Sequence, residues 1–232
     1  MRLALGNGLG VVPADFDGDG RLDLFVANDQ TPNLLWLNQG EGAFRESAAL
    51  FNCAVDTNGR ARAGMGVDVT DLDDDLDLDF IVVNMAREND GLYFNQGQFF
   101  TEETTRAGIS RVNRTMTRFG VGFADFDQDA FVDLFVANGR VNMVMPPIDP
   151  ADPYSEPNTL LRGVPGPRFE EVQPIGGTAV LLSATSRGAA FGDVDGDGGI
   201  DVLVVNRDAP AHLLMDVAAG RGHWLLARVV EK

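Results

Sequence analysis

One acidic pattern occurs four times in this chain of 232 residues, and an apolar run follows it each time. The first copy reads DFDGDGRLDLFVAN and spans 15–28, and the others span 71–84, 125–138 and 193–206. In every copy aspartates stand at positions 1, 3, 5 and 9, and an asparagine ends the apolar run. Such a recurring unit predicts a repeat architecture, in which copies of one supersecondary structure pack against their neighbours.

The spacing and content of the unit predict its structure. The copies begin 56, 54 and 68 residues apart, and a glycine stands five residues before each first aspartate. Apolar runs such as LFVA at 24–27 are short and rich in β-branched and aromatic residues, which is typical of buried strands. A second apolar run and two turns follow in each unit. We therefore predict an all-β chain whose residues 1–221 form a β-propeller of about four four-stranded antiparallel blades.

The third spacing is longer because the segment at 141–158 contains five prolines. Proline lacks the N–H that a strand needs for its ladder, so we predict an irregular insertion without a strand. Two interpretations stay open: a tolerated surface insertion, and a functional loop on one rim of the propeller.

The formal charge of −17 argues against a nucleic acid or an anionic membrane surface as the partner. Nucleic acids and anionic membrane surfaces both attract lysine and arginine. Of the 35 acidic residues, 18 lie in the four motifs, so bound cations would cancel about half of the excess charge. The single cysteine, Cys53, allows no internal disulfide, and no apolar run has the length of a membrane span. Residues 1–10 lack the features of a signal peptide, which fits a cytoplasmic chain or one whose leader is not in this sequence.

The acidic loops have the composition of a cation site. Side chains at positions 1, 3 and 5 converge on one point when the chain curls tightly, and glycine at position 6 permits that curl. The carbonyl oxygen of position 7 then faces the same point, and the aspartate at position 9 completes a ring of oxygen ligands, which suits Ca²⁺ better than Mg²⁺. The predicted metal ligands are Asp15, Asp17, Asp19, Arg21 and Asp23; Asp71, Asp73, Asp75, Asp77 and Asp79; Asp125, Asp127, Asp129, Phe131 and Asp133; and Asp193, Asp195, Asp197, Gly199 and Asp201.

The four loops are not equivalent. The loops at 15–23 and 193–201 carry glycine at positions 4 and 6, whereas those at 71–79 and 125–133 do not. A non-glycine residue in left-handed backbone costs roughly 1 kcal/mol. We therefore predict up to four bound Ca²⁺ ions, held most firmly by the first and fourth loops. An EF-hand is excluded, because position 12 is a valine inside a strand and not the glutamate that precedes a helix.

The pattern of glycine, four aspartates and asparagine resembles the FG-GAP/VCBS repeat, the calcium-loop blade of integrin alpha-subunit propellers and of many bacterial secreted proteins. The resemblance covers about residues 10–215. It implies that aspartate and asparagine side chains hold calcium, and that the protein is extracellular or periplasmic. Gly222, His223, Trp224 and Leu225 resemble the junction to a C-terminal ASPIC/UnbV-type domain, with glycine in place of asparagine. Residues 222–232 are thus expected to be a closing strand or the start of a truncated domain of that type.

Propellers of this family have about seven blades, whereas four units occur here. The chain is then a fragment, a ring of four blades, or half of a ring shared by two chains. Because bare edge strands favour unwanted association, we expect pairing between a strand at 1–10 and one at 222–230 to close the ring.

Catalytic residues are not apparent in the sequence. His212, His223 and Cys53 are best explained by structural roles, and no nucleophile elbow, P-loop or dinucleotide fingerprint occurs. Five arginines precede the predicted inner strands. They either bind carboxylate or sulfate groups, including those of acidic glycans, or pair with acids of neighbouring blades. These are Arg60, Arg62, Arg114, Arg118 and Arg187.

We predict a non-enzymatic, calcium-stabilised binding module whose partner is a protein or a glycan, with a homo-oligomer as one way to complete the ring. The alternatives are a propeller-hosted carbohydrate lyase or hydrolase, and a non-catalytic fragment of a longer propeller protein. Fold alone does not choose among them, because propellers host many functions.

Overall fold

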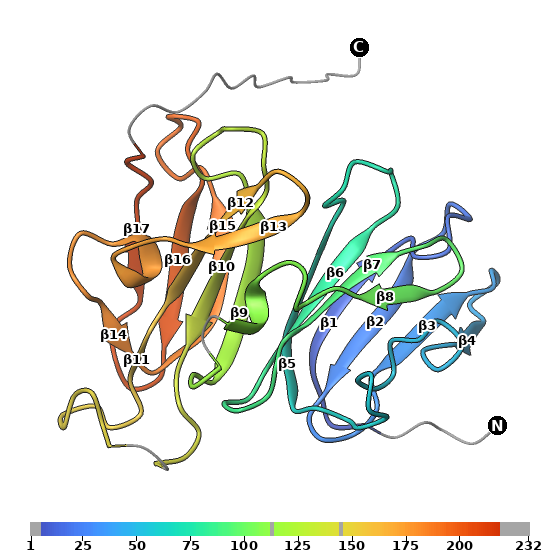
Figure 1. The fold of residues 1–232 in the computed structure, drawn as a ribbon, viewed down its shortest axis with the longest axis horizontal. Coiled ribbons are helices and arrows are strands. Elements are labelled where there is room, and N and C mark those ends of the chain that lie inside the picture. Colours follow the sequence, from blue (N-terminus) through green and yellow to red (C-terminus); the bar gives the residue numbers. More distant parts are fainter. Residues whose placement is uncertain (1–5, 112–113, 144–145, 219–232) are drawn as a thin grey trace.

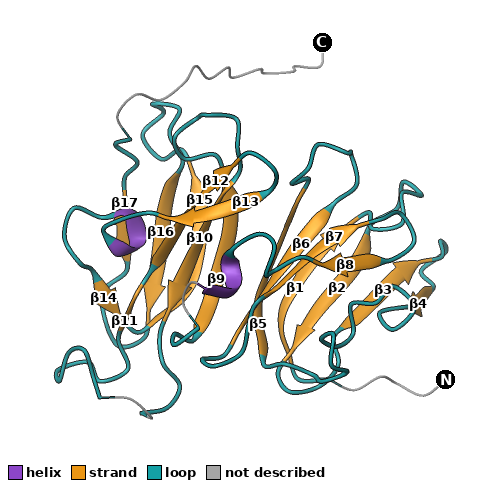
Figure 2. Ribbon diagram, viewed as in Figure 1, coloured by secondary structure: helices purple, strands orange, loops and turns teal. Residues whose placement is uncertain are grey.

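The computed structural model describes residues 6–111, 114–143 and 146–218. Antiparallel strands dominate this part of the chain, and its only helices are the short 3₁₀ turns η1 (Ile109–Arg111) and η2 (Ile175–Gly177) (Figure 2). The strands form four blades that follow one another in chain order (Figure 1). The predicted all-β propeller fold is confirmed.

Each blade is a meander in which consecutive strands pair antiparallel. The first and second blades have four strands each, as predicted. They contain β1 (Gly8–Ala14), β2 (Asp23–Asn28), β3 (Leu34–Asn38) and β4 (Phe44–Glu46), then β5 (Gly64–Thr70), β6 (Asp79–Asn84), β7 (Gly91–Asn95) and β8 (Phe100–Glu102).

The third blade also has four strands, and three strands of the fourth blade lie within the described residues. The predicted closing strand at 222–230 and the junction residues at 222–225 lie outside them. The strands are β9 (Arg118–Ala124), β10 (Asp133–Asn138), β12 (Thr159–Val164) and β13 (Arg168–Glu171), then β15 (Ser186–Gly192), β16 (Asp201–Asn206) and β17 (His212–Leu214).

The proline-rich insertion is not wholly irregular, so the prediction of no strand at 141–158 is wrong at one point. Its last part forms β11 (Glu156–Pro157), which pairs with β14 (Ser183–Ala184) in a two-stranded sheet. Proline fits there because both strands of such a ribbon are edges. The buried carboxylate of Glu156 accepts the Thr117 N–H at 2.8 Å, which fixes the end of the insertion to the third blade.

Successive blades pack face to face, and their inner strands β1, β5, β9 and β15 lie side by side (Figure 1). The repeated glycine explains this close approach. A Cβ added to Gly10 would lie 2.5 Å from the Met65 carbonyl oxygen, and one on Gly66 would overlap the carbonyl of Phe119. No residue larger than glycine fits there without moving the strands apart.

The apolar core is divided into three clusters, one between each pair of neighbouring blades. In the first, Phe25 of β2 packs against Phe80 of β6, with ring centroids 4.4 Å apart. Phe16, from the first acidic loop, lies fully buried against the same Phe80 ring at 5.8 Å. The acidic loops therefore contribute core residues as well as carboxylates.

The two ends of this row of blades expose apolar side chains. On the fourth blade, Leu203 and Val205 are 41% and 52% exposed. On the first, Leu9 and Val11 of β1 are 59% and 63% exposed. Among the described residues, no further blade covers either face.

Candidate metal centres

All four acidic loops lie on one rim of the molecule. Each joins the inner strand of a blade to the next strand, as the loop between β1 and β2 does. The inner strands run in the same direction, so the loops gather at the upper edge in Figure 1. The repeat thus places all four acidic loops on one side.

The aspartate at position 9 of each loop is buried and links three parts of its blade. The carboxylate of Asp23 accepts the Phe16 N–H at 3.0 Å and the Asn38 N–H at 2.7 Å. Asp79, Asp133 and Asp201 each accept the corresponding two backbone N–H groups at 2.8–2.9 Å. Because all four are at most 3% exposed, this residue anchors the loop to the sheet before any cation is considered.

The aspartates at positions 1 and 5 hold the curl of the loop. Asp15 accepts the N–H groups of Asp19 and Gly20 at 3.1 and 2.8 Å, and Asp19 accepts that of Arg21 at 3.0 Å. The other three loops repeat these bonds. These bonds fix the positions of the carboxylate oxygens within each loop.

Three carboxylates in each loop have oxygens within 4.8 Å of one another. The first and fourth loops bring together positions 1, 3 and 5, whereas the second and third bring together positions 1, 3 and 9. Asp75 and Asp129 therefore stand outside the tightest group, and so do Asp23 and Asp201. The clusters are Asp15, Asp17 and Asp19; Asp71, Asp73 and Asp79; Asp125, Asp127 and Asp133; and Asp193, Asp195 and Asp197.

These residues fit a divalent cation by their chemistry and by their spacing. All the side-chain atoms that could bind a metal here are carboxylate oxygens. Calcium–oxygen distances of about 2.3–2.6 Å place two oxygens on opposite sides of the ion roughly 5 Å apart, which matches the spacing of these clusters. The Oδ1 atoms of Asp17 and Asp127 are buried and accept no hydrogen bond from the described residues. Both belong to position 3, so this oxygen is available to a cation.

Burial and like charge disfavour ionisation of these groups. Burial, reinforced by the neighbouring loop aspartates, raises the pKa of Asp17, Asp73 and Asp127. Burial also raises the pKa of Asp79 to about 7 and that of Asp133 to about 6, although their backbone hydrogen bonds act in the opposite direction. A divalent cation would relieve both effects.

The position-7 residues Arg21, Asp77, Phe131 and Gly199 donate their N–H to the position-5 carboxylate. Their carbonyl ligation stays a prediction. The asparagine that ends each motif is not placed for ligation, so the expectation that asparagine holds the ion is wrong. Asn28 ends β2, at the strand end away from the loop, and its Nδ2 donates to the Pro32 carbonyl at 2.7 Å. Asn28 thus stabilises the turn between β2 and β3, on the rim opposite the acidic loop.

The backbone conformation predicted for the loops is present in all four. Positions 4 and 6 have φ between 55° and 88°, including Asp74, Leu76, Gln128 and Ala130. The second and third loops thus adopt left-handed backbone without glycine. The strain predicted for these two loops is in place, and its effect on binding stays a prediction.

Two arginines lie against the loops, and one of them could not be predicted from the motif. Arg162 of β12 pairs with Asp127 at 2.8 Å and with Asp129 at 2.5 Å. Arg21 pairs with Asp19 within the first loop and donates to the Asn38 carbonyl at 2.9 Å. Arg162 is 29 residues beyond the third loop, and only the register of β12 on β10 brings them together.

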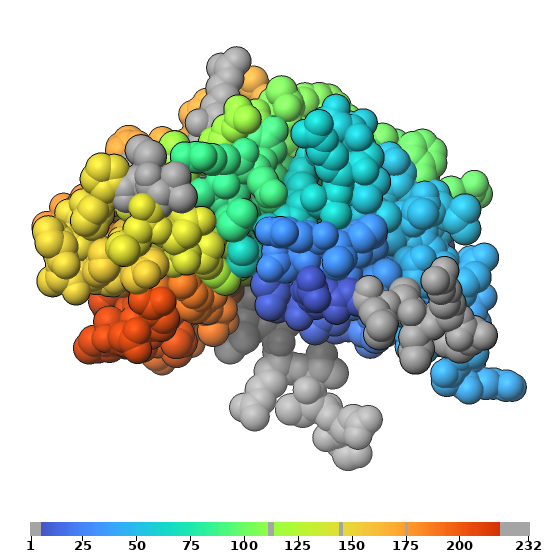
Figure 3. All heavy atoms as spheres, turned by 90° about the horizontal axis from the view of Figure 1, so that it is seen from below, coloured from blue at the N-terminus to red at the C-terminus, as the bar shows by residue number. Residues whose placement is uncertain are grey.

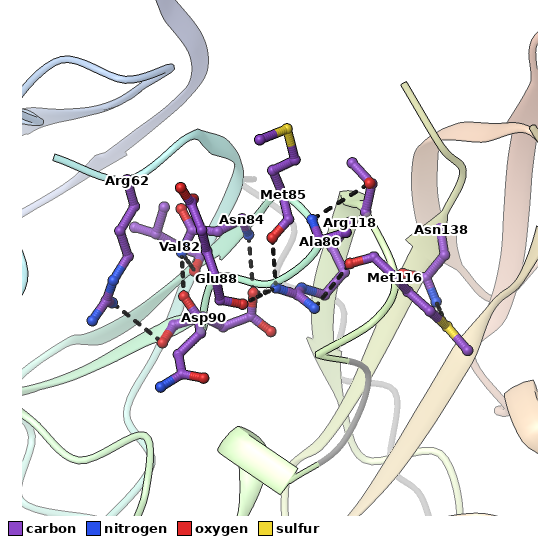
Figure 4. A network of polar contacts seen from close by, with 12 residues as sticks. Arg62, Val82, Asn84, Met85, Ala86, Glu88, Asp90, Met116, Arg118 and Asn138 are labelled. Carbon is purple, nitrogen blue, oxygen red and sulfur yellow. Dashed lines mark hydrogen bonds and ion pairs between the residues drawn. The ribbon is translucent and has the colours of Figure 1, made fainter. Parts of the chain in front are cut away.

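The arginines that precede the inner strands have different roles. Arg118 is buried and pairs with Asp90 at 2.6 Å, and its other nitrogens bond backbone carbonyls such as that of Glu88 at 2.8 Å (Figure 4). Arg187 lies over the Phe119 ring at 4.2 Å and donates to carbonyls of Gly139 and Arg140. For Arg118, pairing with an acid of a neighbouring blade is confirmed. Arg187 contacts the neighbouring blade through a ring and backbone carbonyls, so neither interpretation is confirmed for this residue.

Of the residues considered for catalysis, His212 and Cys53 have structural surroundings. His212 lies in β17, where its Nδ1 is 3.2 Å from Nδ2 of Asn206. Burial raises the pKa of the Cys53 thiol, which makes a reactive thiolate scarce at neutral pH. His223 lies outside the described residues. No described helix is long and apolar enough to cross a membrane.

Comparisons with known proteins agree with the repeat seen in the sequence. Residues 15–82 match the family model of the FG-GAP-like repeat. Human cartilage acidic protein 1 is 27% identical over 220 residues, which are 90% of this chain and 30% of that protein. A solved structure of an Agrocybe aegerita lectin, described as specific for non-reducing terminal N-acetylglucosamine, is similar with a TM-score of 0.46 and 16% identity. That match covers 88% of this chain and 51% of the lectin chain. The chain therefore spans about a third to a half of the length of these proteins.

Proposed function

We propose that this protein is a calcium-stabilised β-propeller module for binding a partner, and that it works outside the cytosol. One observation carries the proposal: the same acidic loop, with the same hydrogen bonds, is built four times on one rim. Four chance clusters of exposed acids would not share their backbone geometry. The match of residues 15–82 to the FG-GAP-like repeat supports the same interpretation.

Calcium is the cation that the ligands favour. Carboxylates supplied by a curled loop offer an adaptable set of oxygens, whereas Mg²⁺ requires a near-ideal octahedron and keeps several waters. Sites of modest affinity fill where calcium is millimolar, and extracellular modules use this range. That chemistry supports an extracellular or periplasmic location.

The ion would act on stability through the core. The N–H of Phe16 is bonded to Asp23, and the Phe16 ring packs between the first two blades. Neutralising the loop carboxylates removes their mutual repulsion and holds this residue in place. In the third loop Phe126 has the same role against Phe191, with centroids 6.4 Å apart.

A thermal melt of metal-stripped protein, titrated with CaCl₂ or with MgCl₂, tests the proposal. Binding to the native state raises the melting temperature by mass action. We expect a large rise with calcium and little change with magnesium. An equal response to both ions would contradict the choice of calcium, and no response to either would overturn the metal sites.

A matched pair of variants assigns the effect to the loops. Asp17→Asn removes a carboxylate whose Oδ1 accepts no bond from the described residues, so it should reduce the calcium response. Asp208→Asn removes an exposed acid outside the loops and should leave the response unchanged.

A further inference from the structure

We infer that a polar cleft on the rim opposite the acidic loops binds an acidic saccharide; this rests on the proposed binding function. The cleft has a volume of about 360 Å³ and lies at the ends of the strands away from the loops. Figure 3 views the molecule from that side. Its size is within the range of about 300–1,000 Å³ that is usual for small-ligand sites. Four segments line it: 56–62, 87–89, 102–105 and Arg114.

The charge of the cleft is opposite to that of the molecule. Four arginines and three carboxylates line it, in a chain whose formal charge is −17. Asp56 and Glu102 pair with Arg62 at 3.8 and 2.7 Å, and Glu88 accepts the Ala63 N–H at 2.8 Å. All three acids are therefore engaged within the protein.

The remaining arginines are exposed and available. Arg60, Arg87 and Arg114 make no ion pair within 4.0 Å with any described acid. In so acidic a protein, three cations that face one cleft without acidic partners form a local site for an anion.

The backbone holds these arginines together in advance. The Arg87 N–H donates to the Arg114 carbonyl at 2.7 Å. Asp56 accepts the N–H groups of Asn58 and Arg60, both at 2.8 Å, which closes the turn that carries Arg60. Because the segments are already linked, a ligand pays little ordering entropy beyond that of the side chains.

The other lining groups select the class of anion. Thr57, Asn58 and Thr105 are exposed and offer hydroxyl and amide groups, and polar groups make up most of the surface. Arginines bind carboxylate or sulfate in a forked geometry, and hydroxyls and amides bond sugar hydroxyls. A uronate or sulfated sugar unit supplies both, whereas a fatty acid or an aromatic acid would leave these groups unpaired.

Calorimetric titration with a tetrasaccharide that contains two glucuronate units tests the site, at fixed saturating calcium. We expect binding that weakens with salt, and no binding of the neutral chitotetraose. Arg60→Gln and Arg114→Gln should each weaken binding at least fivefold. For Arg87 the substitution is Asn, because its φ of 73° is tolerated by asparagine.

Arg168→Gln is the matched control, since Arg168 is an exposed arginine of β13 away from the cleft. Equal binding of both tetrasaccharides, or equal loss in Arg168→Gln and in the cleft variants, would overturn the inference. The calcium-dependent melt is unaffected by this outcome, so failure of the cleft and failure of the calcium sites are distinguishable.

A second inference has a separate basis in the two exposed ends: we infer that a second copy of this chain covers them. In each of the first three blades, the side chains at motif positions 11 and 13 pack into the apolar cluster shared with the next blade. Phe25, Ile81 and Phe135 at position 11 are at most 2% exposed, whereas Leu203 at the same position is 41% exposed. Within the described residues, the fourth blade thus presents an uncovered apolar face.

The first blade presents the other half of the interface. Val67, Val121 and Ala189 each pack into the cluster shared with the preceding blade. The equivalent residue of β1 is Val11, which is exposed. Gly188 is equivalent to the close-approach glycines Gly10, Gly66 and Gly120. Of the residues that the structure describes, only Val205 lies within 4 Å of a Cβ added to Gly188. One chain thus carries both sides of an interface that it already forms three times.

Two copies joined in this way give eight blades, the upper end of the usual range of about four to eight. Each fourth blade meets the first blade of the partner, so two identical contacts close the ring and leave no apolar end. We expect a dimer by size-exclusion chromatography with light scattering at micromolar protein concentration. Leu203→Asp and Val11→Asp should each give monomers.

Mixing these two variants should restore a dimer, because one intact interface forms between them. Leu50→Asp is the control: Leu50 is 72% exposed but lies in a turn outside both faces. A monomeric parent chain, open-ended larger assemblies, or a dimer that neither variant disrupts would overturn the inference.

Discussion

The guanidinium of Arg118 and the carboxylate of Asp90 form an ion pair of 2.6 Å between the third and second blades. Their side chains are 1% and 5% exposed. Asp90 also accepts the Asn84 N–H at 2.9 Å, so the pair joins β9 to the end of β6 (Figure 4). Desolvation raises the pKa of Asp90 even though Arg118 acts against it. The pair is therefore sensitive to loss of either partner.

Removal of one partner of this pair should destabilise the fold. Arg118→Met leaves the Asp90 charge buried and unpaired, which typically costs about 3–5 kcal/mol. Urea denaturation followed by circular dichroism measures the loss. Arg106→Met is the control, because its pair with Glu103 is exposed and long at 3.7 Å, and should change stability by less than about 0.5 kcal/mol. A loss for Arg118→Met as small as that of the control would contradict the role of the pair.

Glycine at position 6 should improve the second and third loops. Leu76 and Ala130 have φ of 74° and 71°, and glycine removes roughly 1 kcal/mol of strain there. Leu76→Gly and Ala130→Gly should therefore raise the melting temperature in saturating calcium. The reverse change, Gly198→Ala, should lower it, since Gly198 has φ of 88°. Gly192→Ala, at a position with ordinary φ and open space, is the neutral control.

The stability of the metal-free protein should fall as the pH rises from about 4 to about 7. Asp79 and Asp133 have folded pKa values near 7 and 6, above the ordinary 3.8. In this window the folded state retains protons that the unfolded state has lost, so stability decreases with pH. Urea midpoints at half-unit pH steps measure the slope. In saturating calcium the slope should vanish or reverse, because the ion binds the ionised carboxylates; identical slopes with and without calcium would contradict the account.

Removal of Arg162 should strengthen the third loop. Its guanidinium occupies Asp127 and Asp129, two carboxylates that a cation would need. Arg162→Gln should raise the calcium affinity of one site severalfold in a calorimetric titration, while Arg168→Gln, on the neighbouring strand, leaves all sites unchanged. The effect will be modest because Arg162 is half exposed and solvent already screens the pair.

The blade could be predicted from sequence because its determinants are local. The aspartates, the glycine before them and the apolar alternation lie within some twenty residues, so loop, strand and turn follow from the motif itself. The bulk of the candidate site follows too, because three of the four motif aspartates converge within each loop, at positions 1, 3 and either 5 or 9. The prediction for asparagine was wrong because β2 begins at the loop and ends at Asn28. The length of this six-residue strand places Asn28 on the far rim.

The repeat, the all-β blade and the four clusters of carboxylates are thus encoded in the motif. The burial of Arg118 between blades, the contact of Arg162 with the third loop, and the exposure of Leu203 where Phe25 is buried arise from the packing of the blades. These properties depend on which blade faces which. Identical motifs have the same local conformation, but burial and ion pairing come from neighbours far along the chain, or from a partner surface.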